Sequence, residues 1–281
     1  MKKVRLNGAD FVYNSAGDEH EHAIVVLHGG RGIGDHRRDF QAFLPLADAY
    51  RVLAYDQRGC GLTSLTPPFT FAQFADDLEA FRLEVCGGKK IILIGGSFGG
   101  MIALTYAARY QAGLSHLILR GTAPSYHMQD DVFAHLRQRL PQAPSASEAM
   151  VRKLIVDGCE DDIELRLIWL ACQPLYFEEF DPDAALLATR ELHIHAETHR
   201  ELFQHDKYYD VRAALPTIKV PTYIVVGAND WICPVQQSQV IAAGIPGSEL
   251  DVIEGANHPV HIEKNELVLA RIRDFIRRRA A

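Results

Sequence analysis

The stretch that decides the fold is Ile91-Ile92-Leu93-Ile94-Gly95-Gly96-Ser97-Phe98-Gly99-Gly100, which sets a G-x-S-x-G turn directly after an apolar run. Such a run is typical of a buried strand, and the small and apolar residues 101–108 predict a helix packed closely on it. A sharp strand-to-helix turn lifts a serine hydroxyl clear of the sheet, and flanking glycines leave room for its strained backbone. We therefore predict that Ser97 is a nucleophile. The alternative is a glycine-rich turn without chemistry.

Similar apolar runs recur along the chain. We predict further strands at 4–6, 11–14, 23–27, 50–55, 114–119, 222–226 and 250–253. Helical patterns at 71–84 and 100–112 lie between some of them. Strands that are apolar throughout and alternate with helices indicate an α/β fold, with a mostly parallel sheet covered on both faces. In such sheets the chemistry gathers at the carboxyl ends of the strands, which is where Ser97 lies.

The pattern changes between Pro124 and about Tyr209. Strand-like runs stop there, and helical stretches at 132–140, 148–156 and 163–171 are joined by breaks that contain proline. One crossover between neighbouring strands needs far fewer residues than this segment holds. We therefore expect residues 1–124 and 210–281 to form an α/β core, and residues 125–209 to form a helical lid above the strand ends.

A serine hydroxyl is a weak nucleophile at neutral pH, so Ser97 needs a base to take its proton and a carboxylate to orient that base. Asp230 and His258 each follow a predicted strand directly, and we predict that they are the acid and the base. The alternative role for Asp230 is to cap the following turn. His261 is the nearest rival base, but we expect it in the final helical region rather than on the strand-end loop.

The tetrahedral intermediate of acyl transfer also needs backbone N–H donors. We expect one from Phe98, immediately after the nucleophile. The other should come from the loop His28-Gly29-Gly30-Arg31-Gly32, where we select Gly30 because glycine lets the backbone approach the substrate oxygen. His28 is expected to make structural hydrogen bonds, because the role of base is already filled.

Three motifs carry a resemblance to a known family: His28-Gly29-Gly30-Arg31-Gly32, Tyr55-Asp56-Gln57-Arg58-Gly59-Cys60-Gly61-Leu62-Thr63-Ser64 and Gly95-Gly96-Ser97-Phe98-Gly99-Gly100. Over nearly its whole length the chain resembles the α/β-hydrolase fold superfamily, and within it the proline iminopeptidase branch of serine peptidases. The order Ser97, Asp230, His258 is also that of the superfamily. The resemblance implies that the second motif is a turn that shapes the pocket. Asn257-His258, with Glu263 five residues later, matches the family's histidine loop.

Two departures from the family's pattern concern the substrate. Arg31 stands where the family usually has proline. The resemblance implies that a peptidase of this branch binds the free α-amine through carboxylates from the lid and near the triad acid, yet Trp231 follows Asp230. Glu178 and Glu179 are the lid acids that we select for this role. Further candidates are Glu160, Glu164 and Glu197.

The leading hypothesis is a serine hydrolase that cleaves a small amide or ester through an acyl-enzyme, with iminopeptidase activity as its most specific form. A carboxylesterase or lactonase without amine recognition is the second hypothesis. Its pocket would be apolar, and the side chains that we expect around it are Phe98, Trp169, Tyr176, Phe177 and Trp231. A non-catalytic ligand-binding protein on the same scaffold is the third, and the intact set of Ser97, Asp230 and His258 counts against it.

Composition disfavours several other classes. A net charge of -7 over 281 residues argues against a surface that binds nucleic acid. The five cysteines are scattered without a C-x-x-C pair, which indicates neither a disulfide framework nor a zinc site. Neither the apolar core of a signal peptide nor a run of about 18 apolar residues is present. We expect a soluble cytoplasmic protein that uses no cofactor or metal and takes a small-molecule or short-peptide substrate; its oligomeric state stays open.

Overall fold

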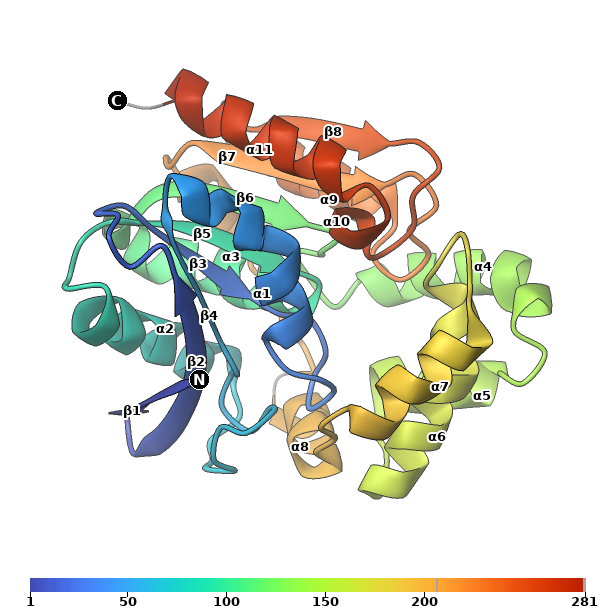
Figure 1. The fold of residues 1–281 in the computed structure, drawn as a ribbon. Helices are drawn as coiled ribbons and strands as arrows, with labels where there is room; N and C mark the ends of the chain where they lie inside the picture. The colour runs from blue at the N-terminus through green and yellow to red at the C-terminus, as the bar shows by residue number, and fades with distance from the viewer. Residues whose placement is uncertain (206, 280–281) are drawn as a thin grey trace.

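A mostly parallel sheet of eight strands runs through the computed structural model, which describes residues 1–205 and 207–279 (Figure 1). The strands lie in the order β1-β2-β4-β3-β5-β6-β7-β8. They are β1 Lys2–Leu6, β2 Ala9–Ala16, β3 Ala23–Leu27, β4 Arg51–Tyr55, β5 Ile91–Gly96, β6 Leu114–Arg120, β7 Thr222–Gly227 and β8 Glu249–Ile253. Only the pairs β1–β2 and β2–β4 are antiparallel among these strands. The predicted α/β fold class is confirmed.

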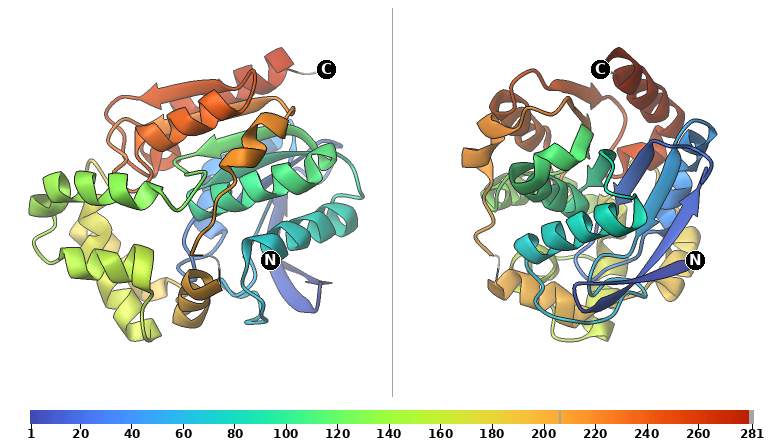
Figure 2. Two further views of the ribbon diagram at one scale, coloured as in Figure 1. Left: turned by 180° about the vertical axis from the view of Figure 1, so that it is seen from behind. Right: turned by 90° about the vertical axis from the view of Figure 1, so that its left-hand side faces the viewer.

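Helices cover both faces of the sheet (Figures 1 and 2). One face carries α1 Arg37–Phe43, η1 Leu44–Asp48 and α11 Asn265–Arg279, and the other carries α2 Phe71–Val85, α3 Phe98–Tyr110 and α9 Val235–Gly244. Strand β3 shows why its run is apolar throughout. Ile24 and Val26 pack in the core on the α1 and α11 side, whereas Val25 and Leu27 pack in the core on the α2 and α3 side. Burial on both faces requires an apolar side chain at every position.

The ends of two helices show how local sequence sets these boundaries. Thr70 caps α2, because its hydroxyl oxygen accepts a hydrogen bond of 3.2 Å from the N–H of Gln73. The helix expected from Gly100 begins two residues earlier, at Phe98, because the sharp turn at Ser97 already brings the chain into helical direction. Shorter helical segments elsewhere are η2 Gln111–Gly113, η6 Arg212–Thr217 and α10 Val260–Glu263.

Between β6 and β7 the described part of the chain forms a helical insertion that lies beside the carboxyl ends of the strands (Figure 1). Its helices are α4 Met128–Arg139, η3 Leu140–Gln142, α5 Glu148–Arg152, the π-helical η4 Lys153–Asp157, α6 Asp162–Cys172, η5 Gln173–Leu175, α7 Pro182–Glu191 and α8 Ala196–His205. A bridge between Ser125 and Asp210 joins the two ends of the insertion, and a bridge between Ile33 and Ile194 attaches it to the loop after β3. No helix within the described ranges is both long and apolar enough to cross a membrane.

His199 ties the insertion together from inside. Its side chain is buried in α8, and its Nε2 donates a hydrogen bond of 3.0 Å to the carbonyl of Leu154. Its Nδ1 accepts from the N–H of Cys159 at 3.4 Å, so the two contacts together require the neutral ring. Burial lowers the pKa of His199 to about 4.

The protein should therefore lose stability in mild acid. An unfolded chain gives histidine a pKa of about 6.5, so the unfolded state takes up this proton first as the pH falls. The contribution of His199 to the free energy of unfolding is complete above pH ~6.5 and is lost toward pH ~4. At pH 5 the loss is about 2 kcal/mol. Urea unfolding at pH 7 and pH 5 measures it. In His199→Gln the difference in free energy of unfolding between pH 7 and pH 5 should shrink by most of that amount. An undiminished difference would contradict the role of His199.

Candidate active site

Ser97 occupies the turn between β5 and α3 with a left-handed backbone, at φ 52° and ψ -124°. The surrounding main chain leaves no space for larger neighbours. A Cβ atom on Gly95 would lie 2.5 Å from the carbonyl oxygen of Gly99, and one on Gly99 would lie 2.5 Å from the carbonyl oxygen of Leu27. The glycines of the motif are therefore required by close approach of three chain segments. They hold the serine in a conformation that costs about 1–3 kcal/mol.

Asp230 and His258 lie just beyond β7 and β8, and their side chains meet. The distance from His258 Nδ1 to Asp230 Oδ2 is 2.9 Å. The other carboxylate oxygen of Asp230 accepts from the N–H groups of Ile232 and Cys233, at 3.1 and 2.8 Å. Because the carboxylate only accepts, Nδ1 carries the proton and Nε2 presents its lone pair. This is the tautomer that a general base needs.

The end of β6 brings this pair to the serine. The N–H of Ser97 lies 3.0 Å from the carbonyl oxygens of both Arg120 and Gly121. A Cβ atom on Gly121 would lie only 2.7 Å from Asp230 Oδ2 and 3.4 Å from His258 Nδ1. Ser97 and His258 also line one cavity of about 590 Å³. The structure thus places the three residues that the sequence singled out at the same edge of the sheet.

The loop that carries His258 is held by two further side chains. The N–H of His258 donates to the side-chain oxygen of Asn257 at 2.8 Å, and the Asn257 amide nitrogen donates to the carbonyl of Leu175 at 3.0 Å. The carboxylate of Glu263 accepts from the N–H groups of Asn257 and Glu178, at 2.6 and 2.7 Å. Glu263 therefore binds the histidine loop to the insertion.

His261 lies in α10, in the helical region where the sequence places it. Its Nε2 is 2.6 Å from Asp39 Oδ1, and Asp39 is also paired with Arg120 at 2.6 Å. Burial, and next the charge of Arg120, lower the pKa of His261 to about 4. The His261 ring is thus part of a buried charged cluster, although it also lines the cavity.

The loop after β3 passes directly over the serine. A Cβ atom on Gly29 would lie 3.2 Å from the Cβ of Ser97, and Gly30 adopts a positive φ of 83° that favours glycine. Phe98 is the first residue of α3, so its N–H has no acceptor within the helix. Both Gly30 and Phe98 line the cavity. Their role as oxyanion donors stays a prediction.

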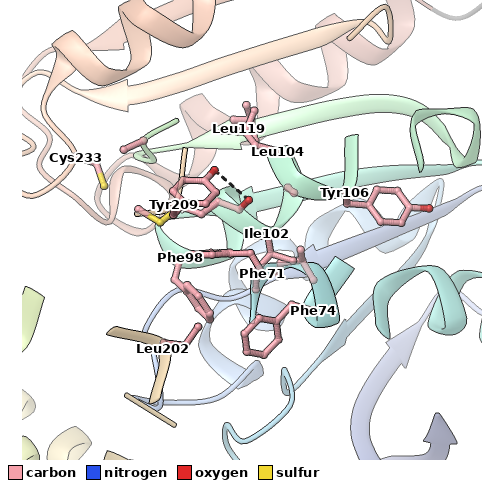
Figure 3. Packing of buried hydrophobic residues seen from close by; sticks show 14 of the residues in the cluster. Phe71, Phe74, Phe98, Ile102, Leu104, Tyr106, Leu119, Leu202, Tyr209 and Cys233 are labelled. Atoms are coloured by element: carbon pink, nitrogen blue, oxygen red, sulfur yellow. Dashed lines mark hydrogen bonds between the residues drawn. The ribbon is translucent and has the colours of Figure 1, made fainter. Parts of the chain in front are cut away.

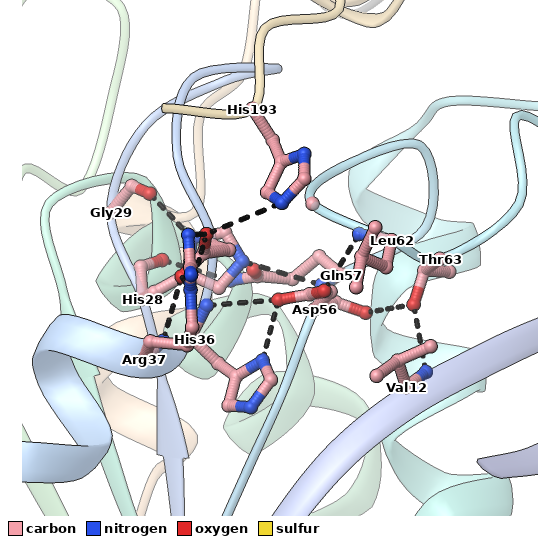
Figure 4. Close-up of polar contacts among 12 residues, drawn as sticks. Val12, His28, Gly29, His36, Arg37, Asp56, Gln57, Leu62, Thr63 and His193 are labelled. Carbon is pink, nitrogen blue, oxygen red and sulfur yellow. Dashed lines mark hydrogen bonds and ion pairs between the residues drawn. The ribbon is translucent and has the colours of Figure 1, made fainter. Parts of the chain in front are cut away.

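His28 and the Asp56 turn support this loop (Figure 4). The side-chain amide of Gln57 donates to the carbonyl of His28 at 2.8 Å, and His28 Nδ1 lies 2.7 Å from the carbonyl oxygen of Gly29. The Asp56 carboxylate accepts from the N–H groups of His36 and Leu62, at 2.9 and 2.8 Å. His28 is buried and has the structural hydrogen bonds that we expected of it.

Aromatic side chains form much of the wall. Trp169 and Tyr176 line the cavity with their rings 5.0 Å apart, and the ring of Tyr176 lies 5.6 Å from that of His258. Phe98 rests on the core beneath, 5.4 Å from Phe74 and 5.6 Å from Phe71 (Figure 3). A cavity with such a wall suits a small, largely apolar group.

Four residues that we expected at the substrate do not line this cavity. Trp231 is completely buried behind Tyr176, at a ring distance of 5.3 Å. Phe177 lies beneath the guanidinium of Arg38 instead. Glu178 is turned toward Arg139 and Asn229, at 3.2 and 2.8 Å, and Glu179 is exposed. Position along a helical insertion does not reveal which face turns inward. The further candidates Glu160, Glu164 and Glu197 do not line the cavity either.

The sequence did not indicate that Glu191 lines the cavity. It is the last residue of α7, and among the insertion residues that the structure describes it is the carboxylate that lines the cavity. No local pattern distinguishes it from the other acids of the insertion. In residues 1–205 and 207–279, the His, Cys, Asp and Glu side chains form no group of three that could hold a metal ion.

Known proteins resemble this chain in sequence and in fold. A family model described as the alpha/beta hydrolase fold matches residues 22–265. The chain is 44% identical to the proline iminopeptidase PfmaB of Pestalotiopsis fici, over 97% of this chain and 98% of that protein. It is 29% identical to a proline iminopeptidase of Saccharolobus solfataricus, over 90% and 84%. A meta-cleavage product hydrolase from Pseudomonas fluorescens superposes with a TM-score of 0.77 at 17% identity, covering 99% of this chain and 98% of the other.

We predict that Gly121→Ala disrupts the site more than it disrupts the fold. The new methyl group would press on Asp230 and shift His258, and displacements of about 1 Å in a catalytic group cost roughly 100-fold in rate. Gly247→Ala is the matched control, because Gly247 also has a positive φ, of 75°, but has no atom within 4 Å of the added Cβ. Both variants should lose about 1–2 kcal/mol of stability. Equal kcat/KM in the two variants would show that Gly121 does not position the pair.

Proposed function

The chain belongs to the α/β-hydrolase fold family, and on that premise we propose that it is a serine hydrolase of the proline iminopeptidase type. The observation that carries the proposal is the shared cavity of Ser97 and His258, whose Nδ1 is held by the buried carboxylate of Asp230. The identity of 44% with a proline iminopeptidase over nearly the whole chain supports a peptidase activity over the other activities of the family.

In the proposed reaction His258 Nε2 takes the proton of Ser97, and the serine oxygen attacks the carbonyl carbon of the N-terminal residue. The N–H groups of Gly30 and Phe98 receive the oxyanion. The C–N bond then breaks, and His258 passes its proton to the leaving nitrogen. Water, activated by the same histidine, adds to the ester carbonyl and releases the acid with Ser97 restored.

Recognition of a free N-terminus requires a carboxylate beside the acyl site, because an ammonium group in a dry pocket is costly unless it is paired. Glu191 is our proposal for this group, since it comes from the insertion and lines the cavity. The aromatic wall of Phe98, Trp169 and Tyr176 offers an apolar surface to a prolyl ring. In this reading residues 125–209 act as the lid over a core of residues 1–124 and 210–281.

A carboxylesterase without amine recognition is the second candidate. It is favoured by the aromatic wall and by the orientation of Glu178 and Glu179 away from the cavity. We also propose that the protein works in the cytoplasm on small or short-peptide substrates. The support is that its five cysteines, all buried, are free thiols, as a reducing compartment would keep them.

We predict that Ser97→Ala lowers kcat by several orders of magnitude while the protein stays folded, because the covalent route is lost and binding remains. His258→Gln should cost about as much, since members of a triad act as a unit. His261→Gln is the contrasting variant. It should lower the unfolding midpoint, because its hydrogen bond to Asp39 is lost, and it should lower kcat far less than His258→Gln does. Steady-state kinetics and thermal unfolding of the three variants test this. A Ser97→Ala enzyme with more than about a tenth of the wild-type kcat would refute the assignment.

Three substrates separate the two candidate activities. Prolyl p-nitroanilide should be cleaved, and its N-acetyl form should be refused, because acetylation removes the charge that Glu191 is proposed to bind. Glu191→Gln should lower kcat/KM for the prolyl substrate roughly 10-fold or more and leave p-nitrophenyl butyrate unchanged, because a charge-assisted hydrogen bond is lost. Glu179→Gln, an exposed acid of the same insertion, is the control. Hydrolysis of the butyrate without any action on the prolyl substrate would favour the esterase.

A further inference from the structure

The charged groups of the cavity wall are mostly neutralised by one another. Asp35 is paired with Arg37 at 2.7 Å, and Asp39 is paired with Arg120 at 2.6 Å. Arg38 is the exception among the wall arginines of α1. Within the part of the chain that the structure describes, no carboxylate lies at ion-pair distance from its guanidinium, although the residue lines the cavity and is exposed to solvent.

The Arg38 side chain is held in place by packing rather than by an opposite charge. Its guanidinium lies over the ring of Phe177, 5.2 Å from the ring centre, which is a favourable cation–π contact. Helix α1 is anchored beneath it by the buried side chains of Phe40 and Phe43. Burial lowers the pKa of Arg38, and the charge of Arg120 lowers it further, whereas the charges of Asp39 and Glu263 oppose this shift. The result is a fixed positive charge with spare hydrogen-bond donors.

From the contacts of its neighbours we place Arg38 toward the His258 side of the cavity. Phe177, which it covers, follows Tyr176, and the ring of Tyr176 lies 5.6 Å from that of His258. The residue after Arg38, Asp39, binds His261 from the helix that follows the histidine loop. One contact of Arg38 and one contact of its neighbour Asp39 thus lead to the elements around His258.

The reaction itself defines what lies on that side. A catalytic histidine gives its proton to the leaving group, so the leaving nitrogen of an amide substrate must sit next to His258. In a peptide, the chain beyond this nitrogen ends in a carboxylate. A planar guanidinium can bind a carboxylate through two parallel hydrogen bonds.

We propose that Arg38 binds the free C-terminal carboxylate of a short peptide substrate. This inference rests on the peptidase function proposed above. The substrate class is then a dipeptide or tripeptide with both ends free, rather than the N-terminus of a long chain. Arg38 would select the leaving group, whereas Glu191 would select the acyl group, so the two specificities are separable in an experiment.

The test compares prolylglycine and prolylglycylglycine with their C-terminal amides, and uses prolyl p-nitroanilide as the reference without a carboxylate. For at least one of the two lengths, wild-type kcat/KM should be about 10-fold higher for the free acid than for the amide, in line with a charge-assisted hydrogen bond. In Arg38→Gln this ratio should fall to about 1, mainly through KM. The variant should cleave the anilide within about 2-fold of wild type.

Lys207→Gln is the matched control, because it removes one positive charge from the same cavity wall at a different place. It should keep the preference for the free acid. Equal rates on acid and amide at both lengths in the wild type, or a preference that survives in Arg38→Gln, would overturn the role of Arg38. An equal loss in Lys207→Gln would also overturn it, because general attraction would then explain the preference. Failure to cleave the anilide and the peptides alike would instead overturn the proposed function, and this inference with it.

Discussion

The close approach of three main-chain segments around Ser97 is the constraint on which the rest of the site depends. The turn after β5, the start of α3 and the loop after β3 come so near that only glycine fits at positions 95 and 99. This crowding holds Ser97 at a positive φ and brings the serine beneath Gly29 and beside the cavity. A strained residue persists only where its surroundings over-determine it, and here those surroundings are backbone atoms rather than flexible side chains.

The parallel strands bring the remaining groups of the site to the same edge of the sheet. Strands β5, β6, β7 and β8 are neighbours in the sheet and end at the same edge, so Ser97 lies on the same cavity as His258, which is hydrogen-bonded to Asp230. Gly121 at the end of β6 contacts both the serine turn and the Asp230–His258 pair. The geometry of the pair is therefore a property of the sheet, whereas the composition of the cavity wall is a property of the loops and the insertion.

Electrostatics divides the cavity into groups that support the fold and groups left available to a substrate. Buried Asp39 is paired with both His261 and Arg120, so Asp39 and His261 support the fold although they line the same cavity as Ser97. Glu191 and Arg38 both line the cavity and are exposed to solvent. A carboxylate and a guanidinium in one cavity form an arrangement that complements a zwitterionic ligand such as a short peptide.

The sequence by itself determined the features that rest on local rules. Apolar runs such as 91–94 predict buried strands because both faces of the sheet are covered, and the glycines around Ser97 predict the turn because no other residue fits there. The direction of side chains in the insertion was decided only by tertiary structure. Glu178 turns toward Arg139 while Glu191 turns to the cavity, and both look alike in sequence. Helix orientation depends on long-range packing against the strand ends, which no local pattern of residues encodes.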